Sequence, residues 1–366
     1  MTVGIMGGKV NLDNYIIPES MPIIDAMAVI NDNAKGIAVV CDGMVLRGVV
    51  TDGNIRRYIL GKGDLRASIA AVTNYEAKYI NHHDGIDPIA YMRANHIDAL
   101  PIVNSRNEVI SIAFTSEEKV YKSTKLDVPV VIMAGGKGTR LLPFTSVLPK
   151  PLIPVGDKTI TELIIEKFST FGCDHFEMIV NYKKNLIRTF FEELPLECTV
   201  SFTEEEEYLG TGGGLKLLEG RYDDAFFMTN CDILVEEDYS EVLRHHREKG
   251  NVVTVVCALR RSVIPYGTVE VSREGAIERI NEKPSFTHLV NTGFYVIEPD
   301  FLRHIPAGTF IHITDAIEHC VAAGGRVGAY PISDSAWHDM GEPAAMERMA
   351  RHLETARQPD PGQSIE

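Results

Sequence analysis

The stretch Val130-Val-Ile-Met-Ala-Gly-Gly-Lys-Gly-Thr-Arg140 runs from an apolar segment directly into a glycine-rich turn. The four successive apolar residues Val130–Met133 predict a buried strand. Gly135, Gly136 and Gly138 allow the backbone to turn tightly and to bring N–H groups against an anion. The stretch therefore predicts a strand followed by an anion-binding loop.

This loop differs from two common phosphate-binding loops. Lys137 is followed by Gly138 and not by Ser or Thr, which excludes a Walker loop, and the glycine spacing is not Gly-x-Gly-x-x-Gly. Arg140 within the loop and Lys150 in the following Leu148-Pro-Lys-Pro-Leu152 can supply positive charge to a bound phosphate.

Strand and helix signals alternate beyond the loop. Thr159 and Glu162 form a capping box for a helix over 159–171, and Gly172 ends it. Further strands are expected at Phe176–Tyr182, Val200–Thr203, Ala225–Thr229 and Val252–Val256. Alternation of this kind predicts a mostly parallel, Rossmann-like α/β sheet with helices on both faces, in three layers. Ligands of such sheets bind beyond the carboxyl ends of the strands.

The first third of the chain contains an internal repeat. Each copy has a helix followed by two strands around a turn, and the copies, which begin near Pro22 and Pro88, are offset by roughly 63 residues. We expect three segments: a tandem α+β module over residues 1–124, the α/β domain over 125–357 and a flexible tail over 358–366.

Composition limits the class of protein. A chain of 366 residues is expected to form two or three domains. Its net charge of −15 argues against a nucleic-acid partner, and the acidic run Glu204–Glu207 is expected to be a solvated loop. The start of the chain lacks a signal peptide pattern and no apolar stretch approaches membrane-spanning length. The 6 cysteines form no Cys-x-x-Cys pair, which is typical of reduced thiols. We therefore expect a cytoplasmic protein without a membrane partner.

The glycine loop resembles the signature of the sugar-1-phosphate nucleotidylyltransferases, and further motifs of that family follow in order over about residues 129–356. These motifs are Leu209-Gly-Thr-Gly-Gly-Gly-Leu215, Thr229-Asn-Cys-Asp232, Tyr266-Gly-Thr268, Glu282-Lys-Pro284, Asn291-Thr-Gly293 and Trp337-His-Asp-Met-Gly341. Cys231 stands where the family usually has Gly.

The resemblance implies a division of the site. Asp232 and Asp339 would hold Mg²⁺, and Arg140 and Lys150 would be the catalytic cations on the nucleotide phosphates. The implied nucleotide-binding residues are Gly135, Gly136, Gly138, Thr139, Gly210, Thr211 and Gly212. The implied sugar-phosphate-binding residues are Gly267, Glu282, Lys283, Asn291 and Thr292.

The activity implied by the resemblance is transfer of a nucleoside monophosphate from a nucleoside triphosphate to a sugar 1-phosphate, with release of pyrophosphate. GTP is favoured, because chains that couple such an N-terminal module to this domain look similar to guanylyltransferases that serve surface glycans. Two alternatives stay open: a metal-dependent glycosyltransferase, and a nucleotide-sensing scaffold whose second domain is inactive. The glycine loop with its two cations favours attack on a triphosphate.

The tandem repeat resembles a pair of cystathionine-β-synthase-type (CBS) domains over about residues 10–122. The first copy carries Gly48-Val-Val-Thr-Asp-Gly-Asn54 near the family's ribose-binding signature, and the second has Thr115-Ser-Glu-Glu118 there. The resemblance implies two alternatives: a regulatory adenine nucleotide held between the repeats, or a dimerisation module. Candidate residues for the nucleotide are Thr51, Asn54, Thr115 and Glu118. We expect a homo-oligomer, a dimer or larger.

Overall fold

The computed structural model describes residues 12–33, 35–61, 63–95, 97–114 and 125–341, together with residues 345, 346 and 349. The chain divides into two compact units, residues 1–122 and 123–366. Thr115, Glu118 and the expected tail lie outside the described residues. Within the described residues, no helix combines the length and apolar character needed to cross a bilayer.

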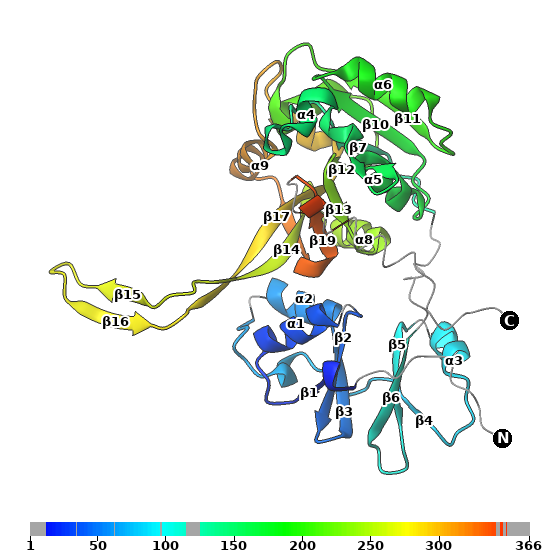
Figure 1. Ribbon diagram of the computed structural model, residues 1–366, viewed down its shortest axis with the longest axis vertical. Helices are drawn as coiled ribbons and strands as arrows, with labels where there is room; N and C mark the ends of the chain where they lie inside the picture. Colours follow the sequence, from blue (N-terminus) through cyan, green and yellow to red (C-terminus); the bar gives the residue numbers. More distant parts are fainter. Residues whose placement is uncertain are drawn as a thin grey trace. The chain divides into compact units, whose positions relative to one another are not determined.

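Two three-stranded sheets of the same design form the first unit (Figure 1). In each sheet the first strand is parallel to the second and the second is antiparallel to the third. The first sheet contains β1 (Ile16–Pro18), β2 (Ile37–Asp42) and β3 (Val45–Thr51), with helices α1 (Ile23–Asp32) and α2 (Asp52–Leu60). The second contains β4 (Ile80–Asn81), β5 (Ala99–Val103) and β6 (Val109–Phe114), with α3 (Pro88–Asn95). Each copy thus contains the helix and two strands that the sequence predicts, and the parallel first strands β1 and β4 are additional.

The two copies share a core. A buried cluster combines Val39 and Leu46 of the first sheet with Val103 and Ile112 of the second. Leu46 N donates a hydrogen bond to the backbone oxygen of residue 107 at 2.9 Å, across the boundary between the copies. The copies therefore stabilise each other.

Thr51 and Asn54 bind each other at the start of α2. The Thr51 hydroxyl donates to Asn54 Oδ1 at 2.7 Å and accepts from Asn54 N at 3.4 Å, and Thr51 N donates to Asn54 Oδ1 at 3.0 Å. The pair is a capping box that stabilises the first turn of α2. A nucleotide at this position would have to compete with these bonds.

A seven-stranded sheet forms the centre of the second unit, with the order β11-β10-β7-β12-β17-β14-β18. All neighbouring pairs are parallel except the two that involve β17. The strands are β7 (Val130–Met133), β10 (His175–Val180), β11 (Thr199–Glu204), β12 (Phe226–Asn230), β14 (Val253–Val263), β17 (Ser285–Ile297) and β18 (Val327–Ser333). The mostly parallel α/β sheet predicted from the sequence is confirmed.

Helical segments cover both faces of this sheet. One face packs against α9 (Ile313–Ala322) and the 3-10 segment η6 (Pro299–His304) in a continuous buried cluster that includes Met228 of β12. The other face packs against α5 and α8, so the unit has three layers.

Aromatic rings fill the space between the sheet and α5 (Ile160–Ser169) and α8 (Tyr239–Lys249). Phe168 of α5 lies 5.4 Å from Phe227 and 4.6 Å from Tyr239, measured between ring centroids. The capping box predicted for α5 is present, since Thr159 N donates to Glu162 Oε2 at 2.7 Å.

A two-stranded arm, formed by β15 (Thr268–Val271) and β16 (Ile277–Asn281), projects from the sheet between the end of β14 and the start of β17 (Figure 1). The sequence predicts a strand over Val252–Val256 here. That end is wrong: the ladder between β14 and β17 continues to Val263 opposite Ser285. Cys257, Ala258 and Leu259 continue the buried part of the strand, and backbone pairing with β17 holds the exposed residues 260–263 extended without a buried face.

Candidate active site

The first glycine loop follows β7 at the carboxyl edge of the sheet. Gly138 has φ 64°, a left-handed conformation that favours glycine. A Cβ atom on Gly138 would lie 2.9 Å from Thr145 Cγ2 and 3.1 Å from Lys150 Cβ. The loop therefore packs directly against the segment that carries Lys150.

The other predicted residues of this loop follow in order. Gly135 is buried and Gly136 is partly exposed. Thr139 and Arg140 begin the 3-10 turn η3 (Thr139–Leu141), and both are exposed. The Arg140 guanidinium is thus accessible to a ligand on the loop.

Lys150 and Asp232 form an ion pair beside this loop. The Lys150 ammonium donates to Asp232 Oδ2, and the two side chains are 15% and 4% exposed. Burial by itself lowers the pKa of Lys150, but the neighbouring Cys231 and Asp232 raise that pKa above its ordinary value. Lys150 therefore remains charged within the site.

Asp232, Asp339 and Arg140 meet around Gly341. A Cβ atom on Gly341 would lie 2.8 Å from Asp232 Oδ2, 2.8 Å from Asp339 Oδ1 and 3.1 Å from Arg140 Nη2. Gly341 N also donates to Asp339 Oδ1 at 2.8 Å. Two carboxylates and one guanidinium therefore surround one small space, which the lack of a side chain at Gly341 leaves open.

Strand pairing explains how residues so far apart in the sequence meet. β13 (Ile233–Val235) follows Asp232 and pairs antiparallel with β19 (Trp337–Asp339). In this register Asp339 lies opposite Ile233, the residue next to Asp232.

The two carboxylates form a donor set that suits magnesium. Magnesium is commonly held by one or two carboxylates, with waters and substrate phosphates as the remaining ligands. Among the described residues, no group of three or more His, Cys, Asp or Glu side chains is placed to hold a metal ion. Asp232 and Asp339 therefore fit a magnesium ion that is completed by substrate, and a structural zinc ion would need more protein ligands.

The second glycine loop, Gly210–Gly213, is held by the segment that precedes α9. Gly212 N and Gly213 N donate to Ile311 O at 3.0 and 3.1 Å, and Ile311 N donates to Leu209 O at 2.9 Å. Gly210 has φ 79°. The close contact with Ile311 requires glycine, because a Cβ atom on Gly210 would lie 2.6 Å from Ile311 O.

Thr211 of this loop has a structural role. Its hydroxyl accepts a hydrogen bond from Ile313 N at 3.2 Å at the start of α9. Nucleotide binding by Gly210, Thr211 and Gly212 stays a prediction.

Glu205 is buried beneath both glycine loops, so the expectation of a solvated acidic run is wrong at this position. The side chain is 1% exposed, whereas Glu204 lies at the surface and pairs with Lys184. A Cβ atom on Gly135 would collide with Glu205 Oε2, and one on Gly214 would lie 2.7 Å from Oε1. The missing side chains of these two glycines make room for the carboxyl group.

The Glu205 carboxyl group is only half satisfied. Oε1 accepts a hydrogen bond from Leu209 N at 3.2 Å, whereas Oε2 has no hydrogen-bond partner among the described residues. Burial raises the pKa of Glu205 to about 7. The sequence does not predict that Glu205 is buried, because nothing in the run of four glutamates distinguishes it from its neighbours.

A Glu205→Gln variant should change how stability depends on pH. The folded-state pKa of about 7 lies above the ordinary value of 4.5, so the folded chain holds this proton more tightly than the unfolded chain. The wild type should therefore lose on the order of 3 kcal/mol of unfolding free energy between about pH 4.5 and pH 7, relative to the variant. Chemical denaturation at each pH measures this, with the exposed neighbour Glu206→Gln as control. Parallel curves for wild type and Glu205→Gln would contradict it.

Asn291 and Thr292 precede Gly293, which packs against Asn230 at the end of β12. Gly293 has φ 84°, and a Cβ atom on it would lie 2.5 Å from Asn230 Nδ2, two residues before Asp232. Thr292 is 2% exposed and its hydroxyl donates to Val256 O at 2.7 Å. Asn291 Nδ2 donates to the Tyr295 hydroxyl at 2.8 Å. Thr292 is therefore a buried support of this turn, and Asn291 is the more exposed of the two.

The neck of the arm is defined here as residues 264–267 and 282–284, which join the β14–β17 ladder to β15 and β16. It contains Gly267, Glu282 and Lys283. A Cβ atom on Gly267 would lie 3.0 Å from Glu282 Oε2, so these two face each other across the neck. Lys283 has φ 44° and lies two residues before β17, whose first six steps, from Ser285 to Asn291, span about 20 Å of extended strand. The structure brings the carboxylates, Arg140 and Lys150 together and leaves these three residues beyond the outer end of the ladder.

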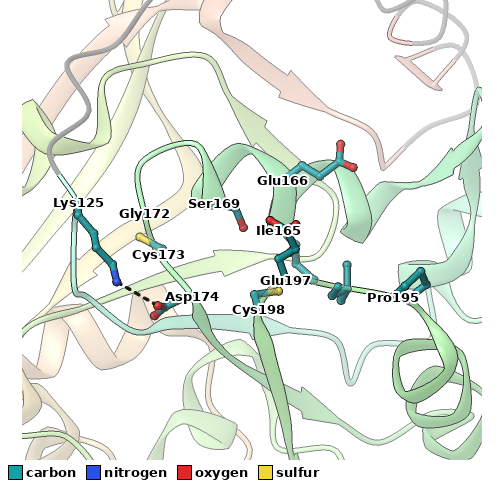
Figure 2. Close-up of a pocket in the computed structure, with 11 residues that line it drawn as sticks. Lys125, Ile165, Glu166, Ser169, Gly172, Cys173, Asp174, Pro195, Glu197 and Cys198 are labelled. Carbon is teal, nitrogen blue, oxygen red and sulfur yellow. Dashed lines mark ion pairs between the residues drawn. The ribbon is translucent and has the colours of Figure 1, made fainter.

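A cavity of about 400 Å³ lies at the opposite edge of the sheet, before β10 and β11 (Figure 2). Lys125 Nζ lies 3.5 Å from Asp174 Oδ2 in this cavity, and Cys173 and Cys198 also line it. Burial raises the pKa of both thiols, which makes them poor nucleophiles. This cavity contains none of the predicted site residues.

Comparison with known proteins agrees with this geometry. Residues 129–356 match the family described as nucleotidyl transferase. The chain belongs to the nucleotidyl transferase family. Residues 10–61 match the CBS domain, so a CBS domain precedes the nucleotidyl transferase domain.

Two curated relatives illustrate the range of the family. The chain is 30% identical over 197 residues to a UTP–glucose-1-phosphate uridylyltransferase of Synechocystis, which covers 49% of this chain and 51% of the relative. It is 30% identical over 240 residues to the mannose-1-phosphate guanylyltransferase catalytic subunit beta of Xenopus tropicalis, covering 63% and 66%. The chain thus spans between half and two thirds of the length of these relatives.

Solved structures show the same fold. The chain resembles HddC from Yersinia pseudotuberculosis with a TM-score of 0.50 and 23% identity, over 62% of this chain and 99% of that one. It also resembles a putative glucose-1-phosphate thymidylyltransferase from Bacillus anthracis with a TM-score of 0.50 and 18% identity, over 64% and 98%. At these identities the likeness shows the fold alone.

Proposed function

We propose that this nucleotidyl transferase transfers a nucleoside monophosphate from a nucleoside triphosphate to a sugar 1-phosphate and releases pyrophosphate. The observation that carries the proposal is the meeting of Asp232, Asp339 and Arg140 around Gly341, with Lys150 paired to Asp232 beside the first glycine loop. Both curated relatives are named for this type of transfer.

The chemistry fits these side chains. An oxygen of the sugar phosphate attacks the α-phosphorus, a new P–O bond forms, and the bond from the α-phosphorus to the oxygen shared with the β-phosphate breaks. Both reactants are anions, so the protein must position them and offset their repulsion, which Arg140 and Lys150 do. The second pKa of a phosphate monoester is near 6, so the attacking oxygen is already ionised at neutral pH and needs no general base.

Magnesium is the cation that we propose for Asp232 and Asp339. Bound there, it would supply positive charge next to the α-phosphate and the leaving pyrophosphate. Lys150 holds the Asp232 carboxylate in place, and the Gly341 N–H holds that of Asp339.

GTP is the nucleotide that we propose, and Glu205 supports it. Guanine presents two adjacent donors, N1–H and the 2-amino group, which a carboxylate can accept together. Uracil and thymine present one N–H between two carbonyl oxygens, which a carboxylate repels. In Glu205 the oxygen without a partner is Oε2, since Oε1 accepts from Leu209 N, so the ionised carboxylate would accept one guanine donor at Oε2 when the base reaches the first glycine loop.

Pyrophosphate release tests the activity. The full chain is incubated with magnesium, each of GTP, UTP, CTP and dTTP, and a panel of sugar 1-phosphates. Release that requires both substrates, and is fastest with GTP, is the expected result. Release of nucleoside diphosphate from an NDP-sugar would indicate a glycosyltransferase instead, and no reaction with any pair would indicate an inactive scaffold.

Lys183 is a positioning residue that the sequence analysis missed. It precedes α6 (Lys184–Glu193), and its ammonium donates to Ser146 O at 2.6 Å and Val147 O at 2.7 Å. These carbonyls belong to α4 (Phe144–Val147), the turn between Arg140 and Lys150. Lys183 therefore fixes the chain that joins the two catalytic cations.

A Lys183→Met variant should lower kcat/KM by about tenfold, because the charged hydrogen bonds that hold α4 are lost. Lys183→Arg should recover part of the loss. Lys184→Met is the matched control, since Lys184 pairs with Glu204 at the surface and should stay near wild type. Equal kinetics for the two Met variants would remove Lys183 from the site.

For the N-terminal module we propose dimerisation, with adenine nucleotide binding as the alternative. The internal bonds between Thr51 and Asn54, and the lack of a carboxylate at Asn54, weigh against a ribose site. Calorimetry of the full chain with AMP and ATP distinguishes the two. Binding that is lost in Thr51→Val would favour the nucleotide.

A further inference from the structure

Three aromatic rings gather at the second glycine loop. Tyr208 precedes the loop, and Phe310 and His312 belong to the segment that holds it. The ring centroids of Tyr208 and Phe310 lie 5.9 Å apart, and those of Phe310 and His312 lie 5.0 Å apart. Tyr208 is 41% exposed and Phe310 is 54% exposed. This cluster therefore presents aromatic surface to a ligand.

The backbone holds these rings in a fixed position. Ile311 O accepts from Gly212 N and Gly213 N, and Ile311 N donates to Leu209 O at 2.9 Å. A Cβ atom on Gly210 would lie 3.4 Å from Phe310 Cε2. Phe310 thus rests on the glycine loop, and the bond between Ile311 N and Leu209 O joins the two residues that follow Phe310 and Tyr208.

Tyr208 also reaches the first glycine loop. Its hydroxyl would lie 4.0 Å from a Cβ atom on Gly136. Burial of this end of the ring, together with the carboxyl group of Glu205, raises the pKa of Tyr208. One ring therefore spans from the first glycine loop to Phe310 and lies close enough to the carboxyl group of Glu205 to interact with its charge.

We propose that Tyr208, supported by Phe310, is the surface on which the base of the nucleoside triphosphate stacks. This inference rests on the proposed function and deepens it. With the triphosphate at the first glycine loop, only the ribose separates the base from the α-phosphate. Tyr208 is an exposed ring that borders this loop. Stacking uses the face of the base and leaves its edge for Glu205. Tyr208 sets the affinity for any nucleotide and Glu205 selects among bases.

The experiment measures binding of GTP with magnesium to the full chain by calorimetry, without sugar phosphate. Tyr208→Ala should weaken GTP binding by about 5- to 150-fold, the scale of one lost base–aromatic stack. Tyr208→Phe keeps the ring and should bind like wild type. Phe286→Ala is the control. It removes a ring of similar exposure (46%) near the start of β17, and it should also bind GTP like wild type.

Inorganic tripolyphosphate, which has no base, separates stacking from phosphate binding. Its affinity should be equal in wild type and Tyr208→Ala. A loss of tripolyphosphate binding as large as that of GTP would overturn the inference, and so would unchanged GTP binding in Tyr208→Ala. Tyr208→Phe behaving like Tyr208→Ala would also overturn it, because the hydroxyl and not the ring would then matter.

Failure of this inference is distinguishable from failure of the proposed function. If no substrate pair releases pyrophosphate but GTP binding depends on the Tyr208 ring, the stacking surface stands and the proposed reaction falls. If wild type releases pyrophosphate and Tyr208→Ala keeps the same KM for GTP, the reaction stands and the stacking surface falls.

Discussion

An Asp232→Asn variant should turn over at least about a hundredfold more slowly than wild type. Asn keeps the size of the side chain but removes the negative charge that would attract magnesium and that offsets the Lys150 ammonium. Loss of one preorganised electrostatic group commonly costs about 10² to 10³ in rate. The chain should stay folded, because the Asn amide oxygen can still accept the hydrogen bond from the Lys150 ammonium.

The measurement is kcat as a function of magnesium concentration. Asp232→Asn and Asp339→Asn should both need more magnesium, because both carboxylates face the space beside Gly341. Asp223→Asn, an exposed carboxylate in the same unit, should behave like wild type. Near-normal turnover of Asp232→Asn at limiting magnesium would exclude Asp232 as a metal ligand.

Local signals were the most predictable part of the chain. The capping box of Thr159 and Glu162, the strand Val130–Met133 and the glycine turn after it each depend on residues that are close in sequence. The meeting of Asp232 with Asp339 is of another kind. It depends on the pairing of β13 with β19, and no periodicity in the sequence specifies that pairing. The resemblance to a family supplied it.

Two features depend on packing that no local pattern encodes. Glu205 is buried because Gly135, which is distant in sequence, leaves a space for its carboxyl group together with Gly214. The length of β14 depends on β17, whose backbone holds the exposed residues 260–263 in an extended ladder. In both cases the deciding partner is distant along the chain, so local propensity points to the wrong result.

The second large effect concerns the nucleotide-binding and sugar-binding parts of the proposed active site. Arg140→Ala should lower kcat/KM for the nucleoside triphosphate by about a hundredfold, because its guanidinium lies beside both carboxylates and the glycine loop. Lys283→Ala should instead raise KM for the sugar 1-phosphate, since the resemblance assigns the neck of the arm to the sugar. Arg279→Ala, on the polar face of the arm, is the control for a lost arm charge and should change neither constant.

Initial rates with one substrate varied at saturating levels of the other provide both sets of constants, which can be compared as free energies. We expect Arg140→Ala to change mainly the constants for the triphosphate, and Lys283→Ala to change mainly those for the sugar 1-phosphate. For Lys283 to act, the β14–β17 ladder must bend so that the neck approaches Asn291, because Lys283 lies beyond Ser285, where the ladder ends, and Ser285 precedes Asn291 by about 20 Å of extended strand. If Lys283→Ala leaves the sugar 1-phosphate KM unchanged while Arg140→Ala shows its full effect, the arm does not reach the sugar, and Asn291 is then the residue to test for that role.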